Sequence, residues 1–232
     1  CPKNPSWEVK AVKVVYDPAK KRVDYEGARS ELFGLPVVPL PLLSHPVGTK
    51  AASGFLVPSI GFSRNNGIEL EQSYYWRITQ SRDLTGSVTA FSDAAPLGRV
   101  NFRSLGKYGA IDLGAYGTYS DRISTSDITT PVGSNVFRGY LEGASRFQFD
   151  PYWSFSASGR YASDRTFLRR YDISRDDRLR STVSAERIGD KSYFSLAGWA
   201  VQTLRTGDPQ GLAPMALPEL DYRLRMDTPL VG

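Results

Sequence analysis

The side chains that most often carry chemistry are scarce in this sequence. Its 232 residues include one histidine and one cysteine, which cannot form a conventional zinc site or an internal disulfide framework. His45 lies between Ser44 and Pro46 in what reads as a connector, where a lone histidine is usually incidental. Asp176 and Asp177 form an adjacent carboxylate pair, which a charged loop tip explains better than acid–base catalysis.

Catalytic motifs with a defined spacing are also missing from the sequence. It contains no nucleophile elbow, no phosphate-binding glycine loop and no cluster centred on histidine. We therefore expect no enzyme activity, no cofactor and no metal site. Lys and Arg number 29 against 24 Asp and Glu, a net charge of +5. They are spread along the chain, which favours weak attraction to anionic surfaces and not nucleic-acid binding.

The apolar residues are mainly of the kind that forms strands. The chain holds 13 Tyr, 11 Phe and 4 Trp against 2 Met, and its mean hydropathy is −0.33. Every apolar run is interrupted before the roughly 18 to 20 residues of a membrane-spanning helix, so a helical membrane protein is excluded. No signal peptide is recognisable, and a chain beginning Cys-Pro-Lys-Asn-Pro reads as a piece of a longer protein.

The segment up to about His45 forms a unit of its own. Apolar residues alternate with polar ones on both sides of a turn at residues 16–21, namely Trp7, Val9 and Ala11 before it and Val23, Tyr25 and Gly27 after it. Such alternation around an Asp-Pro turn predicts a β-hairpin. Three prolines interrupt the apolar run 32–43, which predicts an edge strand, an extended connector or a simple Pro-rich linker.

Long alternating strands begin after Ser53. The strand predicted over 152–164 places Trp153, Phe155, Ala157, Gly159 and Tyr161 on one face and Ser154, Ser156, Ser158 and Arg160 on the other. A second long strand carries Arg138, Glu142 and Arg146 on its polar face. Ordinary strands run about five or six residues. Strands of about ten residues or more, with aromatic ends and one polar face, predict a transmembrane β-barrel.

The loop lengths give a second indication. Alternation predicts about ten strands, at 55–63, 67–79, 83–92, 98–106, 109–121, 136–149, 152–164, 178–189, 192–204 and 218–226. The connections alternate between short turns, at 80–82, 107–108, 150–151 and 190–191, and long loops, at 122–135, 165–177 and 205–217. Outer-membrane barrels have short periplasmic turns, which places the N-terminus in the periplasm. The last residue is not aromatic, so we expect an incomplete barrel. A soluble sandwich or an open β-sheet platform is the alternative.

A set of motifs between Leu35 and Trp76 resembles one family. The set comprises Leu-Pro-Val-Val-Pro-Leu-Pro-Leu-Leu (35–43), His-Pro-Val-Gly (45–48), Ser-Gly-Phe-Leu-Val-Pro (53–58), Tyr-Tyr-Trp-Arg-Ile (74–78) and Arg-Asp-Leu-Thr (82–85). In order and spacing it is similar to the LptD family of lipopolysaccharide (LPS) assembly proteins, also called organic solvent tolerance proteins. The resemblance covers about the first ninety residues by motif, and the remainder by barrel texture alone.

The resemblance implies a fold and a function. Residues 1–47 would be the C-terminal strands of a periplasmic, OstA-like β-jellyroll with a Pro-rich connector, and 48–232 the N-terminal part of an outer-membrane β-barrel. The whole protein would receive LPS from a periplasmic bridge and insert it into the outer leaflet of a Gram-negative cell, through the barrel lumen and a lateral gate. Implied partners are LPS, a plug lipoprotein similar to LptE, a bridge protein similar to LptA, the barrel-assembly machinery and the outer membrane.

Roles for individual residues follow from combining the alternation with the resemblance. Acyl chains would contact the apolar jellyroll face, which includes Val9, Ala11, Val23 and Tyr25. Phosphate and sugar would meet the lumen-facing set, which is Arg138, Glu142, Arg146, Ser156 and Arg160. The family motif near the lateral gate comprises Ser53, Gly54, Phe55, Pro58, Tyr74, Tyr75 and Trp76.

Three further positions are compared with the family. Cys1 matches a jellyroll cysteine whose disulfide partner lies near the end of the family's barrel, beyond this chain; a free thiol is the alternative. Many members carry proline where this chain has Ser73 and Val88. Those prolines weaken strand pairing near the gate, so their absence puts the gate mechanism in question here.

Two rival functions are kept open. A porin-like channel would use the same barrel texture to conduct solutes, with a closed barrel and no jellyroll. A soluble β-rich binding protein of the envelope would need no detergent. An outer-membrane enzyme ranks last, because catalytic groups are missing.

Overall fold

The computed structural model describes residues 7–19, 21–32, 34–40, 43–47, 52–121, 135–205, 207–208 and 215–226. Within them the regular structure is antiparallel strand apart from one four-residue helix, which confirms the predicted all-β class. The elements are β1 (Trp7–Lys10), β2 (Lys13–Asp17), β3 (Arg22–Glu26), β4 (Ala28–Leu32), β5 (Leu35–Leu40), β6 (Ser44–Pro46), β7 (Gly54–Phe55), β8 (Ser59–Ser63), β9 (Gly67–Arg77), β10 (Arg82–Phe91), β11 (Leu97–Leu105), β12 (Gly109–Asp121), β13 (Asn135–Gln148), β14 (Trp153–Ala162), α1 (Phe167–Arg170), β15 (Arg178–Ile188), β16 (Ser192–Thr203) and β17 (Ala216–Leu224).

The N-terminal residues form two small sheets, ordered β1-β4-β5 and β2-β3-β6. The chain passes from one sheet to the other between β1 and β2, between β3 and β4 and between β5 and β6. Gly27 forms the corner at the second crossing with a φ of +63°, and a Cβ there would collide with Val12. Strands that cross between two sheets at such corners are typical of sandwich folds.

This arrangement corrects the predicted hairpin. The turn after Asp17 does join two paired strands, but they are β2 and β3. β1, which contains Val9, pairs with β4 in the other sheet. Alternation across residues 7–16 could not show that the strand breaks at Ala11 and Val12. The Pro-rich run forms β5, an edge strand, as one of the predictions for it stated.

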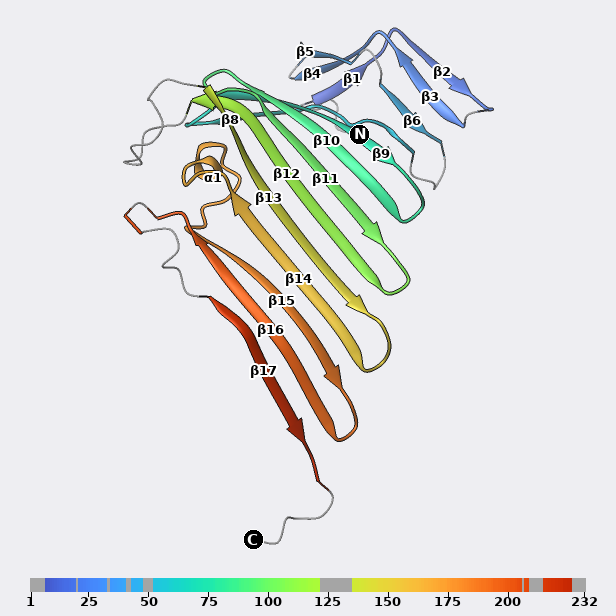
Figure 1. The fold of residues 1–232 in the computed structure, drawn as a ribbon. Helices are drawn as coiled ribbons and strands as arrows, with labels where there is room; N and C mark the ends of the chain where they lie inside the picture. Colours follow the sequence, from blue (N-terminus) through green and yellow to red (C-terminus); the bar gives the residue numbers. More distant parts are fainter. Residues whose placement is uncertain are drawn as a thin grey trace.

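The remaining strands form one long sheet of eleven strands in the described residues. Its path runs from β17 through each preceding strand to β9, and β7 and β8 both pair with β9 (Figure 1). The prediction for 109–121 coincides with β12. The predicted strand 55–63 is wrong, because the structure has two short strands there, β7 and β8, and the other predicted strands begin and end within two residues of the observed ones. Among the residues that the structure describes, the path is open and no closed barrel is seen. No helix in the described part of the chain is long and apolar enough to cross a membrane.

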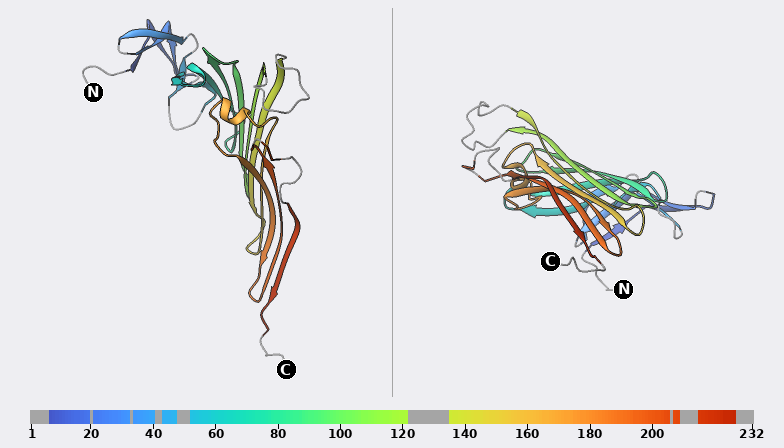
Figure 2. Two further views of the ribbon diagram at one scale, coloured as in Figure 1. Left: turned by 90° about the vertical axis from the view of Figure 1, so that its left-hand side faces the viewer. Right: turned by 60° about the horizontal axis from the view of Figure 1, so that its bottom comes forward.

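The two ends of the long sheet differ in their connections. Tight turns join β9 to β10, β11 to β12, β13 to β14 and β15 to β16 at what we call the short-turn end. The opposite, long-loop end includes residues 163–177. The predicted loops 122–135 and 205–217 belong to the same end, and most of their residues lie outside the described ones. Figure 2 shows that the sheet twists and bends along its strands, with the two small sheets projecting from one end.

The seam between β14 and β15 opens toward the long-loop end. Its paired register stops at Ser158 and Thr182. Beyond that point the side-chain amide of Gln202, on β16, donates to the carbonyl of Ala162 at 2.8 Å and accepts from the Ala162 N–H at 2.9 Å. One side chain thus replaces two ladder hydrogen bonds, because backbone groups left without partners are costly.

Candidate functional site

The two faces of the long sheet differ in chemistry. Residues paired across antiparallel strands lie on the same face, so the register defines each face. One row joins Leu84, Phe102, Leu113 and Gly143. This apolar face exposes large hydrophobic side chains, including Val88, Val100, Leu113, Leu141, Val183, Leu196 and Leu220. Such a continuous exposed apolar surface is rare in soluble proteins and indicates an apolar partner.

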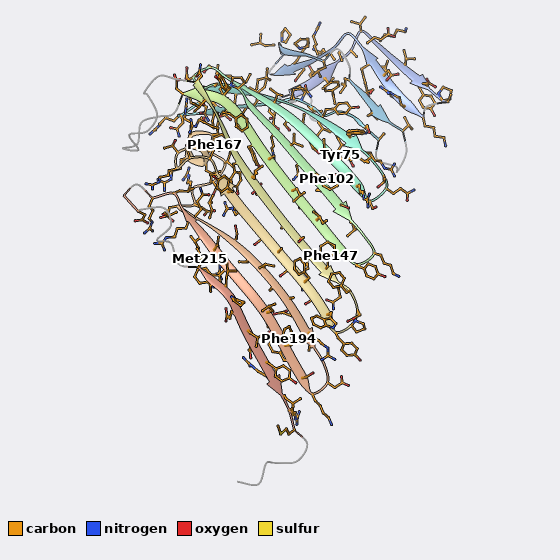
Figure 3. All side chains as sticks on the ribbon, in the orientation of Figure 1. Tyr75, Phe102, Phe147, Phe167, Phe194 and Met215 are labelled. Carbon is orange, nitrogen blue, oxygen red and sulfur yellow. The ribbon has the colours of Figure 1, made fainter. Side chains whose placement is uncertain are left out.

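Aromatic residues gather at both ends of the apolar face. Exposed rings near the short-turn end belong to Trp76, Tyr108, Phe149, Trp153 and Tyr222. Those near the long-loop end belong to Phe62, Tyr119, Phe137 and Tyr161. Figure 3 shows Phe147 and Phe194 near the short turns. The apolar face therefore has an aliphatic middle between two aromatic borders.

The opposite face is polar and linked by hydrogen bonds. Arg103 forms an ion pair with Asp83 at 2.9 Å. The Tyr140 hydroxyl accepts a 2.7 Å hydrogen bond from Arg160 and donates to Glu142 at 3.0 Å. The contacts of Arg103 and Arg160 join neighbouring strands, so these two guanidinium groups are held in place.

Four of the five residues predicted to face a lumen share this polar face. The register pairs Glu142 with Arg160 and Arg146 with Ser156. The Ser156 hydroxyl also lies 2.8 Å from that of Ser184 on β15. These four residues therefore lie on one face of the sheet, whereas a lumen on that side and contact with phosphate or sugar stay predictions.

Arg138 lies on the same side of β13 but requires a correction. Its side chain is only 1% exposed, and its guanidinium donates to both carboxylate oxygens of Asp164, at 2.8 and 2.9 Å, to Thr166 and to the Asp121 carbonyl. Burial raises the pKa of Asp164, but the hydrogen bonds and charge of Arg138 outweigh it, so the net shift is downward. Arg138 is therefore a buried structural cation that is not exposed on the polar face.

The partner of Arg138 belongs to a folded loop that alternation did not reveal. Residues 163–177, which we call the strap, contain α1 and cover the polar face at the long-loop end. Phe167, Leu168 and Tyr171 are buried there against a cluster that includes Leu97, Tyr140, Ala162, Leu179 and Leu204. Their i, i+1, i+4 spacing in a segment predicted only as a polar loop was the available signal.

The motif that resembles the family's lateral gate is brought together at one edge of the long sheet. Gly54 pairs with Tyr75 and Phe55 with Tyr74, whose rings make an edge-to-face contact at 5.0 Å. The Ser53 hydroxyl accepts from the Arg77 N–H at 2.9 Å. A break at residues 56–58, which includes Pro58, separates β7 from β8. Trp76 is exposed on the apolar face.

Pairing between β9 and β10 is continuous at Ser73 and Val88, the two positions compared with the family above. Ser73 pairs with Ser87 and Val88 with Gln72, and the two serine hydroxyls are 2.8 Å apart. The interruption near this edge lies instead in the preceding strand, at residues 56–58. The strand break is thus on the other side of β9 from the position the missing prolines would affect.

The four residues predicted to contact lipid lie in different parts of the N-terminal unit. Val23 and Tyr25 share a face of β3, opposite Tyr16 and Val14. Val9 lies in the other small sheet, and Ala11 lies in the connection between β1 and β2. Cys1 lies outside the described residues.

A buried carboxylate marks the sheet that contains Val9. Glu31 is 2% exposed and accepts from Lys10 at 2.6 Å and from Arg29 at 2.8 Å. Hydrogen bonds from Lys10 and then Arg29 lower the pKa of Glu31. Among the residues that the structure describes, no group of three or more His, Cys, Asp or Glu side chains is arranged to hold a metal ion.

Comparison with known proteins links this arrangement to one family. Residues 136–231 match the family model described as LptD: LPS transport system D. The chain is 27% identical over 205 residues to the LPS-assembly protein LptD of Shewanella sp. (strain ANA-3), covering 87% of the chain and 25% of that protein. The Aliivibrio fischeri protein of the same name is 27% identical over 219 residues, covering 94% and 26%. That of Nitrosococcus oceani is 37% identical over 109 residues, covering 46% and 15%.

The matches and the motif resemblance point to the same family from different parts of the chain. The family model covers residues 136–231, and the motifs lie between residues 35 and 85. The chain spans about a quarter of the length of the Shewanella and Aliivibrio relatives. The chain is therefore similar to the LptD family of LPS-assembly proteins.

Proposed function

We propose that this chain is part of an outer-membrane protein that transports LPS and assembles it in the outer leaflet of a Gram-negative cell. The observation that carries the proposal is the long sheet itself, with one exposed apolar face bordered by aromatic rings and one polar face. The names of the relatives supply the substrate: they are LPS-assembly proteins.

The long sheet is proposed as the first part of a transmembrane β-barrel. Strands β12 and β13 have 13 and 14 residues, enough for a tilted strand to cross a bilayer, which needs about 9 to 11. The apolar face would contact lipid, and the aromatic borders would lie at the two membrane–water interfaces. The polar face would line the lumen, where Arg146 and Arg160 could bind the phosphates of LPS.

The orientation follows from where the N-terminal unit joins the long sheet. Ser53 accepts a hydrogen bond from Arg77, the last residue of β9 before the short turn to β10. Figure 1 shows the two small sheets on the same side as the short turns of β9 and β10. Because short turns are periplasmic in such barrels, this unit would lie in the periplasm, and the strap would lie near the outer surface.

The N-terminal unit is proposed as the end of a jellyroll that passes acyl chains to the barrel. Val14 and Tyr16 are 58% and 53% exposed and share the face of β2 and β3 that contains Val23 and Tyr25. This exposed apolar surface could cover acyl chains. The small sheets also have edge strands, to which a bridge protein similar to LptA could add a strand. A lipoprotein similar to LptE would occupy the complete barrel, which the barrel-assembly machinery would insert.

A photo-crosslinking experiment tests the lipid path. In the full-length protein in cells, a photoreactive amino acid replaces Val14, and LPS adducts are detected by blotting with and without the ATP supply for transport. The matched control replaces Lys13, an exposed neighbour that points to the opposite face and pairs with Glu26. We expect an ATP-dependent adduct at Val14 and none at Lys13. Correctly inserted protein without an adduct at Val14 would remove the main support for transport and favour a channel.

A further inference from the structure

The strap connects parts of the long sheet that are far apart in sequence. It joins β14 to β15, but α1 also reaches the turns between β8 and β9 and between β10 and β11. The contact is made by Arg170, which donates to the Asn65 carbonyl, to Asn66 Oδ1 at 2.8 Å and to the Asp93 carbonyl at 2.6 Å. One side chain therefore holds two hairpin turns near the free edge of the sheet.

The two turns are themselves built to receive this side chain. Gly67 has a φ of +73°, and a Cβ there would collide with Ser92 and Asp93. The Asp93 N–H donates to the Asn66 carbonyl at 3.1 Å, and the Ile68 N–H to the Ser92 hydroxyl at 3.0 Å. The turns are thus packed together and present their acceptors to a single guanidinium, whose planar fork suits several acceptors at once.

The two arginines that anchor the strap differ in their partners. Arg138 is buried and binds the carboxylate of Asp164, a charge-assisted pair. Each of the three acceptors that the structure shows for Arg170 is neutral. Every hydrogen bond from a guanidinium has an ionised donor, but an anionic acceptor adds the attraction between opposite charges and can accept two parallel bonds. An anion that reached Arg170 would therefore compete well with its present acceptors, whereas Arg138 would stay bound.

We propose that Arg170 is a phosphate-responsive clasp. In its closed state it fastens the strap to the hairpin turns of β8–β9 and β10–β11, and so fixes the long-loop end of the sheet's free edge. A phosphate of a glycolipid that reaches the polar face beneath the strap exchanges for the three neutral acceptors and releases the edge. The strap stays in place through Arg138 and the core around Phe167. The ligand class rests on the proposed function, but the clasp itself does not.

Spin-label distances test the clasp in the full-length protein in lipid nanodiscs. Genetically encoded nitroxide labels replace Arg64 and Arg175, exposed residues in the β8–β9 turn and the strap. We expect a narrow distance distribution in the parent protein and a broader one in Arg170→Ala. Arg169→Ala changes an exposed neighbour on α1 and should match the parent. An unchanged distribution in Arg170→Ala would overturn the clasp.

A second label pair shows that the variant is folded. Labels at Lys107 and Asp190 report on two short turns at the opposite end, and their distance should be the same in every variant. If it changes in Arg170→Ala, the variant Arg170→Lys decides. Lysine keeps the charge without the planar fork, so the clasp predicts partial broadening between 64 and 175 with no change between 107 and 190. A narrow 64–175 distribution in Arg170→Lys would count against it.

Adding ligand tests the response to phosphate. Purified LPS should broaden the 64–175 distribution of the parent and leave that of Arg170→Ala unchanged, and enzymatically dephosphorylated LPS should have no effect on either. Equal responses to the two lipids would overturn the phosphate step. Failure of the proposed function would look different: no adduct would form at Val14, while the effect of Arg170→Ala without ligand would persist.

Discussion

The two ends of the long sheet are stabilised in different ways. At the long-loop end, a buried ion pair, an aromatic cluster and the Arg170 contacts join residues that are far apart in sequence. At the short-turn end, tight turns join strands that follow one another in the sequence. The difference shows that one end is a tertiary structure of its own, whereas the other depends on local strand pairing.

Removing Arg138 should have the largest effect on this comparison. Arg138→Ala leaves the Asp164 carboxylate without its partner, and breaking a buried pair in this way costs about 3–5 kcal/mol. We expect faster hydrogen exchange at the amides of Tyr171 and Ile173, which donate within the strap. Arg146→Ala, on the same strand toward the short-turn end, is the matched control. If both variants exchange alike, the two ends do not differ as described.

The next largest effect is expected at Gln202. Gln202→Leu keeps the side chain's approximate size but removes both hydrogen bonds to Ala162, and each unsatisfied backbone group costs about 1–3 kcal/mol. Gln202→Leu should therefore unfold at a lower temperature than the parent protein. Its Ala162 amide should also exchange hydrogen faster than in the parent. Gln148→Leu at the short-turn end, where the side chain contacts only the Asp150 carbonyl, should have a smaller effect.

Proline substitutions sharpen the comparison within β9 and β10. The Ser73 carbonyl accepts from the Leu56 N–H, so the backbone groups of Ser73 point away from β10, toward the segment that follows β7. Because these directions alternate along an antiparallel pair, the backbone groups of Val88 point toward β9. Val88→Pro should therefore lose a ladder bond, costing about 1–3 kcal/mol, whereas Ser73→Pro should leave the β9–β10 ladder intact. Thermal unfolding of the two variants measures the difference, and equal losses would show that the assigned bonding directions are wrong.

The smallest effect is expected from pH, in the N-terminal unit. The pKa of Glu31 lies below its ordinary 4.5, so its stabilising contribution is complete above that value and disappears as the pH falls through the lowered pKa. Glu31→Gln should therefore weaken the acid-induced loss of structure in this unit. Glu26→Gln, which alters the exposed pair with Lys13, should leave it unchanged. Amide exchange of β1 and β4 between pH 3 and 6 would measure both.

Much of the long sheet could be predicted from the sequence because alternation records a physical constraint. Side chains such as Leu141 and Glu142 point to opposite faces, so the polar and apolar faces appear directly in the residue order. The strap could not be predicted this way, because Phe167 and Arg170 bind residues from β11 to β13 and from distant turns. The division of the N-terminal strands into two small sheets could not be predicted either. The alternation around Val9 and around Val23 is the same whether their strands share one sheet or lie in two.

The Gln202 side chain constrains the order in which the sheet can be completed. The backbone groups of Ala162 find their partners in a residue forty positions later, on a strand that is not adjacent to β14. If β14 pairs with β15 alone, the N–H and carbonyl of Ala162, at the long-loop end of β14, therefore lack these partners until β16 is in place. If the long sheet is part of the proposed barrel, these three strands should assemble as one cooperative block, since adding them one at a time would expose unpaired backbone to lipid.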